Sequence, residues 1–218
     1  LTVLLLASWK RGWIGVWLIA ASVLTAVWSG VAAYDYRVEA DYRLVTQILE
    51  LMRGGAWLLF LAGILSITWE SSPNRLMGRA LTPAIVILCL VGVAVDATGS
   101  VLDGGLKGAI GIDLSLVVRL ALTVIGILLI ENLYRNTKRE HRWGIKYACL
   151  AIGGMFAYEF FMYSEALLFQ TVNANLVNAR GIITALITPL IAVSAARNPD
   201  WSIDVAVSRR VIFHSATL

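Results

Sequence analysis

The chain has 218 residues, of which 59% are hydrophobic and only 15% are charged, and its mean hydropathy is +0.77. Soluble domains carry about 25% charged and 45–50% apolar residues, so this composition excludes an ordinary soluble globular protein. The formal net charge of +4 is gathered in short segments between apolar runs, which indicates membrane orientation and argues against a nucleic-acid partner.

Apolar segments follow one another along the whole chain, and a membrane span needs about 20 predominantly apolar residues. In chain order they lie at 13–34, 46–68, 80–95, 114–133, 146–168 and 180–196, and residues 1–7 resemble the end of an earlier helix. We expect an all-α polytopic transmembrane helical bundle with six whole spans plus a truncated first helix. Residues 1–196 form the predicted membrane domain in the lipid bilayer, and residues 197–218 form a predicted cytoplasmic linker.

Proline and glycine mark several boundaries of these spans. The apolar run 80–95 is short and is expected to extend into its flanks, with Pro83 in the first turn of its helix, where a missing N–H costs little. Pro189 is expected to break the last run, and Asn198-Pro199 is expected to end it. The Gly-rich segment Asp96–Asp113 is predicted to be a short external loop.

The distribution of lysine and arginine predicts how the spans are oriented. Alternate connections hold twelve basic residues in one set and only four in the other set, which consists of Arg37, Arg43, Lys107 and Arg180. The positive-inside rule places the richer set in the cytoplasm, so the sequence given is predicted to start outside and end inside. No predicted loop is long enough for an external domain.

Ionisable residues within the predicted spans are candidates for function, because they are costly in a membrane and usually face the bundle interior. At about 1.5 Å per residue along a helix, these acids and arginines all fall in the outer half of the bilayer. We expect one polar layer in which Arg119 or Arg53 faces Glu159. The candidate residues are Glu50, Arg53, Arg119, Glu159, Tyr163 and Glu165.

Three interpretations of this layer remain open. Structural ion pairs that fix the register of the helices are the commonest explanation of such residues. A site that senses a signal or a ligand is the second interpretation. A proton or ion pathway is the third and least favoured, because one layer of pairs is too little for a relay across the whole membrane.

The sequence carries no signature of a catalytic or metal site. His141 and His214 both lie in predicted cytoplasmic segments without a second ligand at metal-binding spacing, and no phosphate-binding, metalloprotease or serine-hydrolase motif occurs. The segment after the last span is instead a candidate coupling element that carries helix movement inward. The candidate coupling residues are Pro189, Arg197, Trp201, Arg209 and Arg210.

Four stretches of the chain resemble the membrane region of the PEP-CTERM/exosortase-associated sensor histidine kinases. They are Phe161–Phe169 (FMYSEALLF), Ala179–Gly181 (ARG), Pro189–Trp201 (PLIAVSAARNPDW) and Val207–His214 (VSRRVIFH). The resemblance covers most of the chain and is strongest from Glu131 to the end. These stretches have no chemical signature of their own, so they indicate sequence likeness and not a mechanism.

The resemblance implies a multi-pass kinase of the bacterial inner membrane, with signal transduction by helix repacking. It also implies further helices, a GAF-type region, a homodimer, phosphoacceptor and ATP-binding domains that use ATP and Mg²⁺, and a response regulator controlling exopolysaccharide and PEP-CTERM export genes. No phosphoacceptor can be assigned in this chain, because His141 is followed by Arg142 and His214 by Ser215. The sequence itself therefore contains no cofactor site and no catalytic residue that we can name.

Two other classes of protein are alternatives to a sensor. A small transporter would be expected to show inverted repeats and interrupted helices at matching positions, and only Pro189 suggests an interruption. A membrane-embedded enzyme would be expected to cluster histidines or acids near the cytoplasmic side, whereas the predicted acids lie in the outer half.

Overall fold

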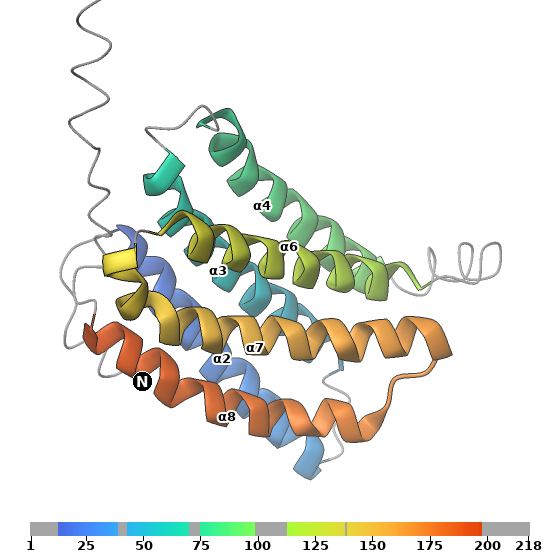
Figure 1. Cartoon of the computed structure of the whole chain (residues 1–218). Helices are drawn as coiled ribbons and strands as arrows, with labels where there is room; N and C mark the ends of the chain where they lie inside the picture. Colours follow the sequence, from blue (N-terminus) through green and yellow to red (C-terminus); the bar gives the residue numbers. More distant parts are fainter. Residues whose placement is uncertain (1–12, 39–42, 70–74, 99–112, 138, 198–218) are drawn as a thin grey trace, which may run out of the picture.

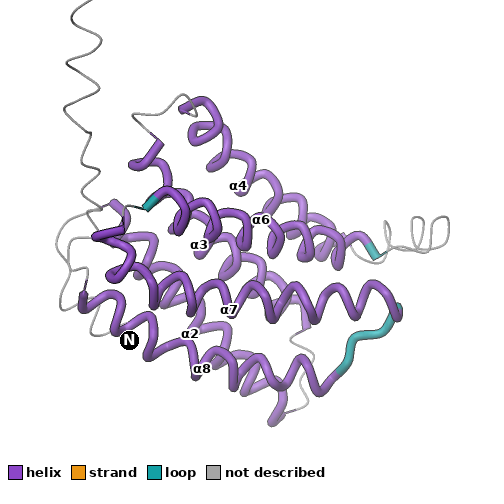
Figure 2. Tube along the Cα trace, in the orientation of Figure 1, coloured by secondary structure: helices purple, strands orange, loops and turns teal. Residues whose placement is uncertain are grey.

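The described part of the protein is a bundle of long helices. The computed structural model describes residues 13–38, 43–69, 75–98, 113–137 and 139–197. Its helices are α2 (Trp13–Val38), α3 (Arg43–Trp69), α4 (Arg75–Thr98), α6 (Leu114–Asn136), α7 (Arg139–Phe169) and α8 (Ala174–Arg197). Figure 1 shows them running side by side, and Figure 2 shows that the described ranges contain helix and short loops but no strand.

The six predicted spans are confirmed as helices. Each contains an apolar stretch of 19 to 25 residues, long enough to cross a membrane. The helices are longer than the apolar runs because polar residues at their ends still make helical hydrogen bonds. The predicted remnant at 1–7 and the linker at 198–218 lie outside the described residues.

Helix α3 is the centre of the bundle. About two-thirds of its apolar stretch (67%) is buried, and it packs against α2, α4 and α6, while α7 packs against α6 and α8. Leu58, Phe60 and Leu65 of α3 are fully buried in the core. The apolar stretches of α2, α4 and α8 are only 17–22% buried, so these helices present most of their apolar surface to the surroundings, as lipid-facing helices do.

Small residues let some of these helices approach closely. A Cβ atom added to Gly126 of α6 would lie 2.7 Å from the ring of Phe156 on α7. At Gly92 of α4, an added Cβ would lie 3.0–3.2 Å from Leu51 of α3 and Val118 of α6. These contacts fix the distance and rotation of the central helices, because close packing of backbones replaces a hydrophobic driving force inside a membrane.

Polar caps and turns end several helices. The carboxylate of Asp113 accepts hydrogen bonds from the backbone N–H groups of Ser115 and Leu116 at the start of α6, at 3.1 and 3.3 Å. Helix α7 is followed by Gln170 with a φ of 54°, the left-handed conformation that commonly terminates a helix. Asn173 then caps α8, because its side chain accepts a hydrogen bond from the N–H of Asn175 at 3.0 Å.

Both proline predictions are wrong. Helix α4 begins at Arg75, so Pro83 lies in its interior and not in its first turn. Helix α8 likewise continues through Pro189 to Arg197 and is not interrupted there. A proline removes one hydrogen bond and strains the turn before it, but neighbouring helices hold such a turn together in membrane bundles. Asn198-Pro199, which we predicted to end this helix, lies outside the described residues.

Two polar residues that we expected in external connections belong to helices. Asp96 lies in the last turns of α4, which extends to Thr98, and Arg180 lies in the second turn of α8, which begins at Ala174. Both are buried, at 7% and 5% exposure. The prediction failed because it ended each helix where the apolar run ended, whereas here ion pairs inside the bundle allow charged residues to continue it.

Candidate functional site

Six ionisable side chains inside the bundle form a continuous series in which positive and negative groups alternate. Five of them are buried, and the side chain of the sixth, Glu50, is only 12% exposed. In order of contact the series runs Arg53, Glu159, Arg180, Glu50, Arg119 and Asp96. We call this series the charge network. The network holds three guanidinium groups and three carboxylates, so its formal net charge is zero. Burying charges inside the bundle costs much less free energy when each has a partner of opposite charge.

The first half of the charge network joins α3, α7 and α8. A guanidinium N–H of Arg53 donates to the Glu159 carboxylate, and another lies 3.7 Å from the sulfur of Met155. Arg180 reaches the same oxygen of Glu159 from the other side at 3.5 Å. Arg53 is only 1% exposed and Glu159 6%, so this contact is withdrawn from water and lipid alike.

Glu50 is the central acceptor of the charge network. One oxygen of its carboxylate lies 2.8 Å from Nη2 of Arg180 and 3.2 Å from Nη1 of Arg119, and it also accepts the hydroxyl hydrogen of Tyr163. The same nitrogen of Arg180 contacts Glu159 at 3.5 Å. Arg180 therefore bridges two acids, and Glu50 bridges two arginines.

The second half of the charge network joins α3, α4 and α6. Nη2 of Arg119 donates to Asp96 at 2.6 Å and lies 3.4 Å from the backbone carbonyl of Gln47. The hydroxyl of Ser115 donates to the other oxygen of Asp96 at 2.6 Å and accepts from Nε of Arg119 at 3.2 Å. Because both carboxylate oxygens are engaged, Asp96 is held firmly against α6.

The indole ring of Trp28, on α2, contacts two arginines of the charge network. The guanidinium carbons of Arg53 and Arg180 lie 4.4 and 4.8 Å from the centre of its ring, within the distance of a cation–π interaction. Trp28 is 5% exposed. Every described helix thus contributes a side chain to this one site.

The network lies at one level of the bundle. Its members on α3, α6 and α8 are in the first halves of those helices, whereas Trp28, Asp96 and Glu159 are in the second halves of α2, α4 and α7. Helices that follow one another in the described chain run in opposite directions (Figure 1), so these halves lie at the same end. This arrangement matches the single polar layer that the sequence predicted.

The structure brings together most of the predicted layer, with one exception and several additions. Glu50, Arg53, Arg119 and Glu159 all lie in the charge network, and the arginine that faces Glu159 is Arg53. Tyr163 adjoins the network through its hydrogen bond to Glu50. Glu165 does not join them: its carboxylate lies 3.4 Å from the side chain of Asn173, in the turn between α7 and α8. It points there because six residues of helix turn it well away from Glu159.

Sequence reasoning missed four members of the site. They are Trp28, Asp96, Ser115 and Arg180. Counting charges could have indicated only Arg180, since the predicted layer held three glutamates against two arginines and therefore lacked one base. The same count gave no reason to add Asp96. No signal in the sequence selected Trp28 or Ser115.

The candidate coupling residues are described only in part. Pro189 lies on the exposed side of α8. The guanidinium of Arg197, at the end of α8, lies 5.5 Å from the ring centre of Trp143 and 4.9 Å from that of Tyr147, so it ties the end of α8 to the start of α7. Trp201, Arg209 and Arg210 lie outside the described residues.

The described residues hold no group of three or more His, Cys, Asp or Glu side chains that could bind a metal ion. The acids of the charge network instead each face guanidinium groups. Its chemistry is therefore ion pairing and hydrogen bonding. Its distinctive property is that the four groups inside the series, Glu159, Arg180, Glu50 and Arg119, each contact two partners of opposite charge.

No family model, curated protein or solved structure matches the chain. The fold and the site define the class of the protein by themselves. It is a multi-pass α-helical membrane protein. Of its six described apolar helices, five are joined at one level by a formally neutral network of charges, and α2 joins them through Trp28.

Proposed function

We propose that this chain is the membrane-embedded input module of a sensor histidine kinase of the PEP-CTERM/exosortase-associated type. The observation that carries the proposal is the charge network, because together with Trp28 it connects all six described helices. A stimulus that displaces one helix must rearrange contacts on the others. The resemblance of Phe161–Phe169 and Pro189–Trp201 to that family supports the choice of kinase as the output.

The proposed input step is an exchange of ion-pair partners. Nη2 of Arg180 is 2.8 Å from Glu50 and 3.5 Å from Glu159, so a small shift of α8 changes which acid it contacts more closely. Small displacements of packed helices that exchange discrete contacts are a common form of switching. A stimulus acts in this scheme by binding one of the two arrangements more tightly than the other.

The proposed output runs along α8 to the far end of the bundle. Arg197 ends this helix and contacts Trp143 and Tyr147 at the start of α7, so a shift of α8 is passed to that contact. We propose that Trp201, Arg209 and Arg210 carry it onward to cytoplasmic domains. The implied partners are a second copy of the protein and a response regulator, and the implied cofactors are ATP and Mg²⁺ bound by those domains.

The proposed location is the bacterial inner membrane, with the charge network in the outer half of the bilayer. Lysine and arginine are concentrated in the connections at the opposite end, which the positive-inside rule assigns to the cytoplasm. Alkaline phosphatase inserted within residues 99–112 should be active, and the same insertion within 70–74 should be inactive. The reverse pattern of phosphatase activity would contradict the proposed orientation but would leave the kinase assignment untested.

The kinase assignment is tested in the native gene product. Its reading frame should continue beyond Leu218 into phosphoacceptor and ATP-binding domains, and the whole protein in membranes should phosphorylate itself from ATP. Glu159→Gln and Arg119→Gln should each change the extent of autophosphorylation or its response to the stimulus, whereas the exposed Arg135→Gln should not. A native gene without a kinase domain, or normal signalling by both folded variants, defeats the proposal.

A further inference from the structure

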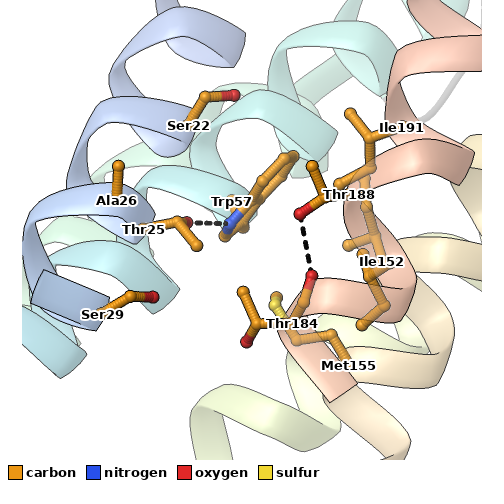
Figure 3. Close-up of a pocket in the computed structure, with 11 residues that line it drawn as sticks. Ser22, Thr25, Ala26, Ser29, Trp57, Ile152, Met155, Thr184, Thr188 and Ile191 are labelled. Carbon is orange, nitrogen blue, oxygen red and sulfur yellow. Dashed lines mark hydrogen bonds between the residues drawn. The ribbon is translucent and has the colours of Figure 1, made fainter. Parts of the chain in front are cut away.

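A pocket lies between α2 and α8, next to the charge network but separate from it. Its volume is about 200 Å³, and its walls come from α2, α3, α7 and α8 (Figure 3). An apolar cavity of about 150 Å³ is enough to take up benzene, so this pocket can hold a ring or a short alkyl chain. Trp57 of α3 and Ile152 of α7 form its inner wall, and both are buried.

The pocket opens toward the bilayer and not toward water. Its residues occupy the middle of α2, α3 and α8, far from the ends of the helices. Ala26 on α2 is exposed, and Thr184 on α8 is half-buried, so the gap between these two helices reaches the surface of the bundle. A ligand would therefore arrive from the lipid phase, which favours an amphipathic molecule over a water-soluble one.

The walls carry more hydroxyl groups than an apolar core requires. They are the hydroxyls of Ser22, Thr25, Ser29, Thr184 and Thr188. Thr25 is already engaged twice, since its oxygen accepts from Nε1 of Trp57 at 3.1 Å and its hydrogen is donated to the carbonyl of Ala21 at 2.6 Å. The hydrogen bond between Trp57 and Thr25, drawn in Figure 3, holds the indole ring in place.

Two walls offer hydrogen-bonding capacity that a ligand could use. Ser22 is 5% exposed, and its hydroxyl oxygen has no hydrogen-bond partner within the part of the chain that the structure describes. Thr184 and Thr188 on the facing helix donate to backbone carbonyls four residues earlier, at 2.9 and 2.8 Å, which leaves lone pairs on both oxygens. Ser22 can donate to a ligand, and a threonine can accept from it.

The pocket thus offers the hydroxyl group of a ligand a donor on one wall, Ser22, and acceptors on the facing wall, Thr184 and Thr188. Trp57 and Ile152 offer an apolar surface to the body of the ligand. A charged ligand is disfavoured because the neighbouring charge network is formally neutral and an unpaired ion is costly to bury. We propose that the pocket between α2 and α8 binds a neutral amphipathic alcohol or phenol that enters from the lipid bilayer.

This proposal concerns ligand binding alone, so its test does not depend on whether the protein has kinase activity. The probe is a photoreactive diazirine derivative of octanol, added to the whole chain in lipid nanodiscs and mapped by mass spectrometry of the labelled peptides. We expect saturable labelling of the pocket residues that octanol prevents, and that octane and octanoate at equal membrane concentration do not. Labelling that never saturates, or equal protection by octane, overturns the proposal.

Two variants address the two parts of the pocket. Ala26→Phe should fill the open side and abolish protection, and it replaces an exposed residue, so the core stays intact. Ser22→Ala should weaken octanol binding roughly fivefold, the value of one ordinary hydrogen bond. Ser66→Ala is the matched control, because it removes an exposed hydroxyl of α3 that bonds only to its own helix, at 2.8 Å to Gly63.

The threonine wall supplies an independent check. Thr184→Val keeps the size of the side chain and removes its lone pairs, so it should weaken octanol binding to a similar degree as Ser22→Ala. Each variant is compared at equal helical content and equal behaviour in size-exclusion chromatography. Unchanged octanol binding in Ala26→Phe, or in both Ser22→Ala and Thr184→Val, shows that the pocket is not the binding site.

Discussion

Removing the charge of Arg119 is the sharpest test of how the buried network is held together. The Arg119→Gln substitution deprives Asp96 of the only guanidinium that contacts it among the described residues, leaving the Ser115 hydroxyl. Glu50 keeps Arg180 and Tyr163. The bundle would then hold three buried carboxylates against two guanidinium groups.

The expected cost follows from this imbalance. Removing one partner of a buried ion pair costs about 3–5 kcal/mol, and we expect about 4 kcal/mol for Arg119→Gln because Asp96 is 7% exposed and Arg119 is 6% exposed. Asp96→Asn should cost about 3 kcal/mol, since Arg119 still contacts Glu50. The double variant Arg119→Gln/Asp96→Asn restores the neutrality of the network, so it should lower the free energy of unfolding by about 4 kcal/mol. The two single changes add up to about 7 kcal/mol, so the coupling energy between the two residues should be about 3 kcal/mol.

The assay is equilibrium unfolding in mixed micelles of dodecyl maltoside and SDS, followed by near-ultraviolet circular dichroism. The exposed pair Arg135–Glu131, at 3.1 Å with side chains 76% and 55% exposed, provides the control cycle. Both single changes there, and their coupling, should stay below about 1 kcal/mol. If Arg119→Gln costs no more than Arg135→Gln, or if the two cycles show equal coupling, then the network does not hold the bundle together as described.

Two smaller predictions concern single contacts. Gly126→Ala should destabilise the bundle by about 1–3 kcal/mol, because the new Cβ would lie 2.7 Å from the Phe156 ring, whereas Gly154→Ala, with open space around it, should be neutral or slightly stabilising by the same unfolding assay. Equal effects at both glycines would rule out the close approach of α6 and α7. Tyr163→Phe should cost about 1.5–3 kcal/mol, because its hydroxyl donates to a buried carboxylate, while Tyr158→Phe, whose hydroxyl donates to a backbone carbonyl at 2.7 Å, should cost about 0.5–1.5 kcal/mol. A reversed order would contradict the hydrogen bond from Tyr163 to Glu50 of the charge network.

The predicted layer shows how far position along a helix can be converted into position in space. Counting about 1.5 Å per residue placed Arg53, Arg119 and Glu159 at one depth, and the structure has them there. The same count said nothing about rotation around each helix. It therefore could not tell that Arg53 faces Glu159, or that Glu165 turns toward Asn173.

Asp96 and Arg180 show why the rest of the site was missed. Asp96 directly follows an apolar run and Arg180 is the first residue of one, so a prediction from hydropathy and charge assigns both to the adjoining loops. Inside the bundle each carboxylate or guanidinium meets an opposite charge within 3 Å, which makes burial possible and lets the helix continue. Only the contacts, and not the local sequence, decide between these outcomes.

The sequence by itself determined that this protein is a membrane bundle of at least six helices, because span length and apolar composition are local properties of the chain. It also determined that several charges share one level of the bilayer. Only the tertiary structure decided which charges pair, which helix lies at the centre, and that a hydroxyl-lined pocket remains between α2 and α8. Those features depend on the rotation and separation of packed helices, which contacts such as that of Gly126 with Phe156 fix between residues far apart in the chain.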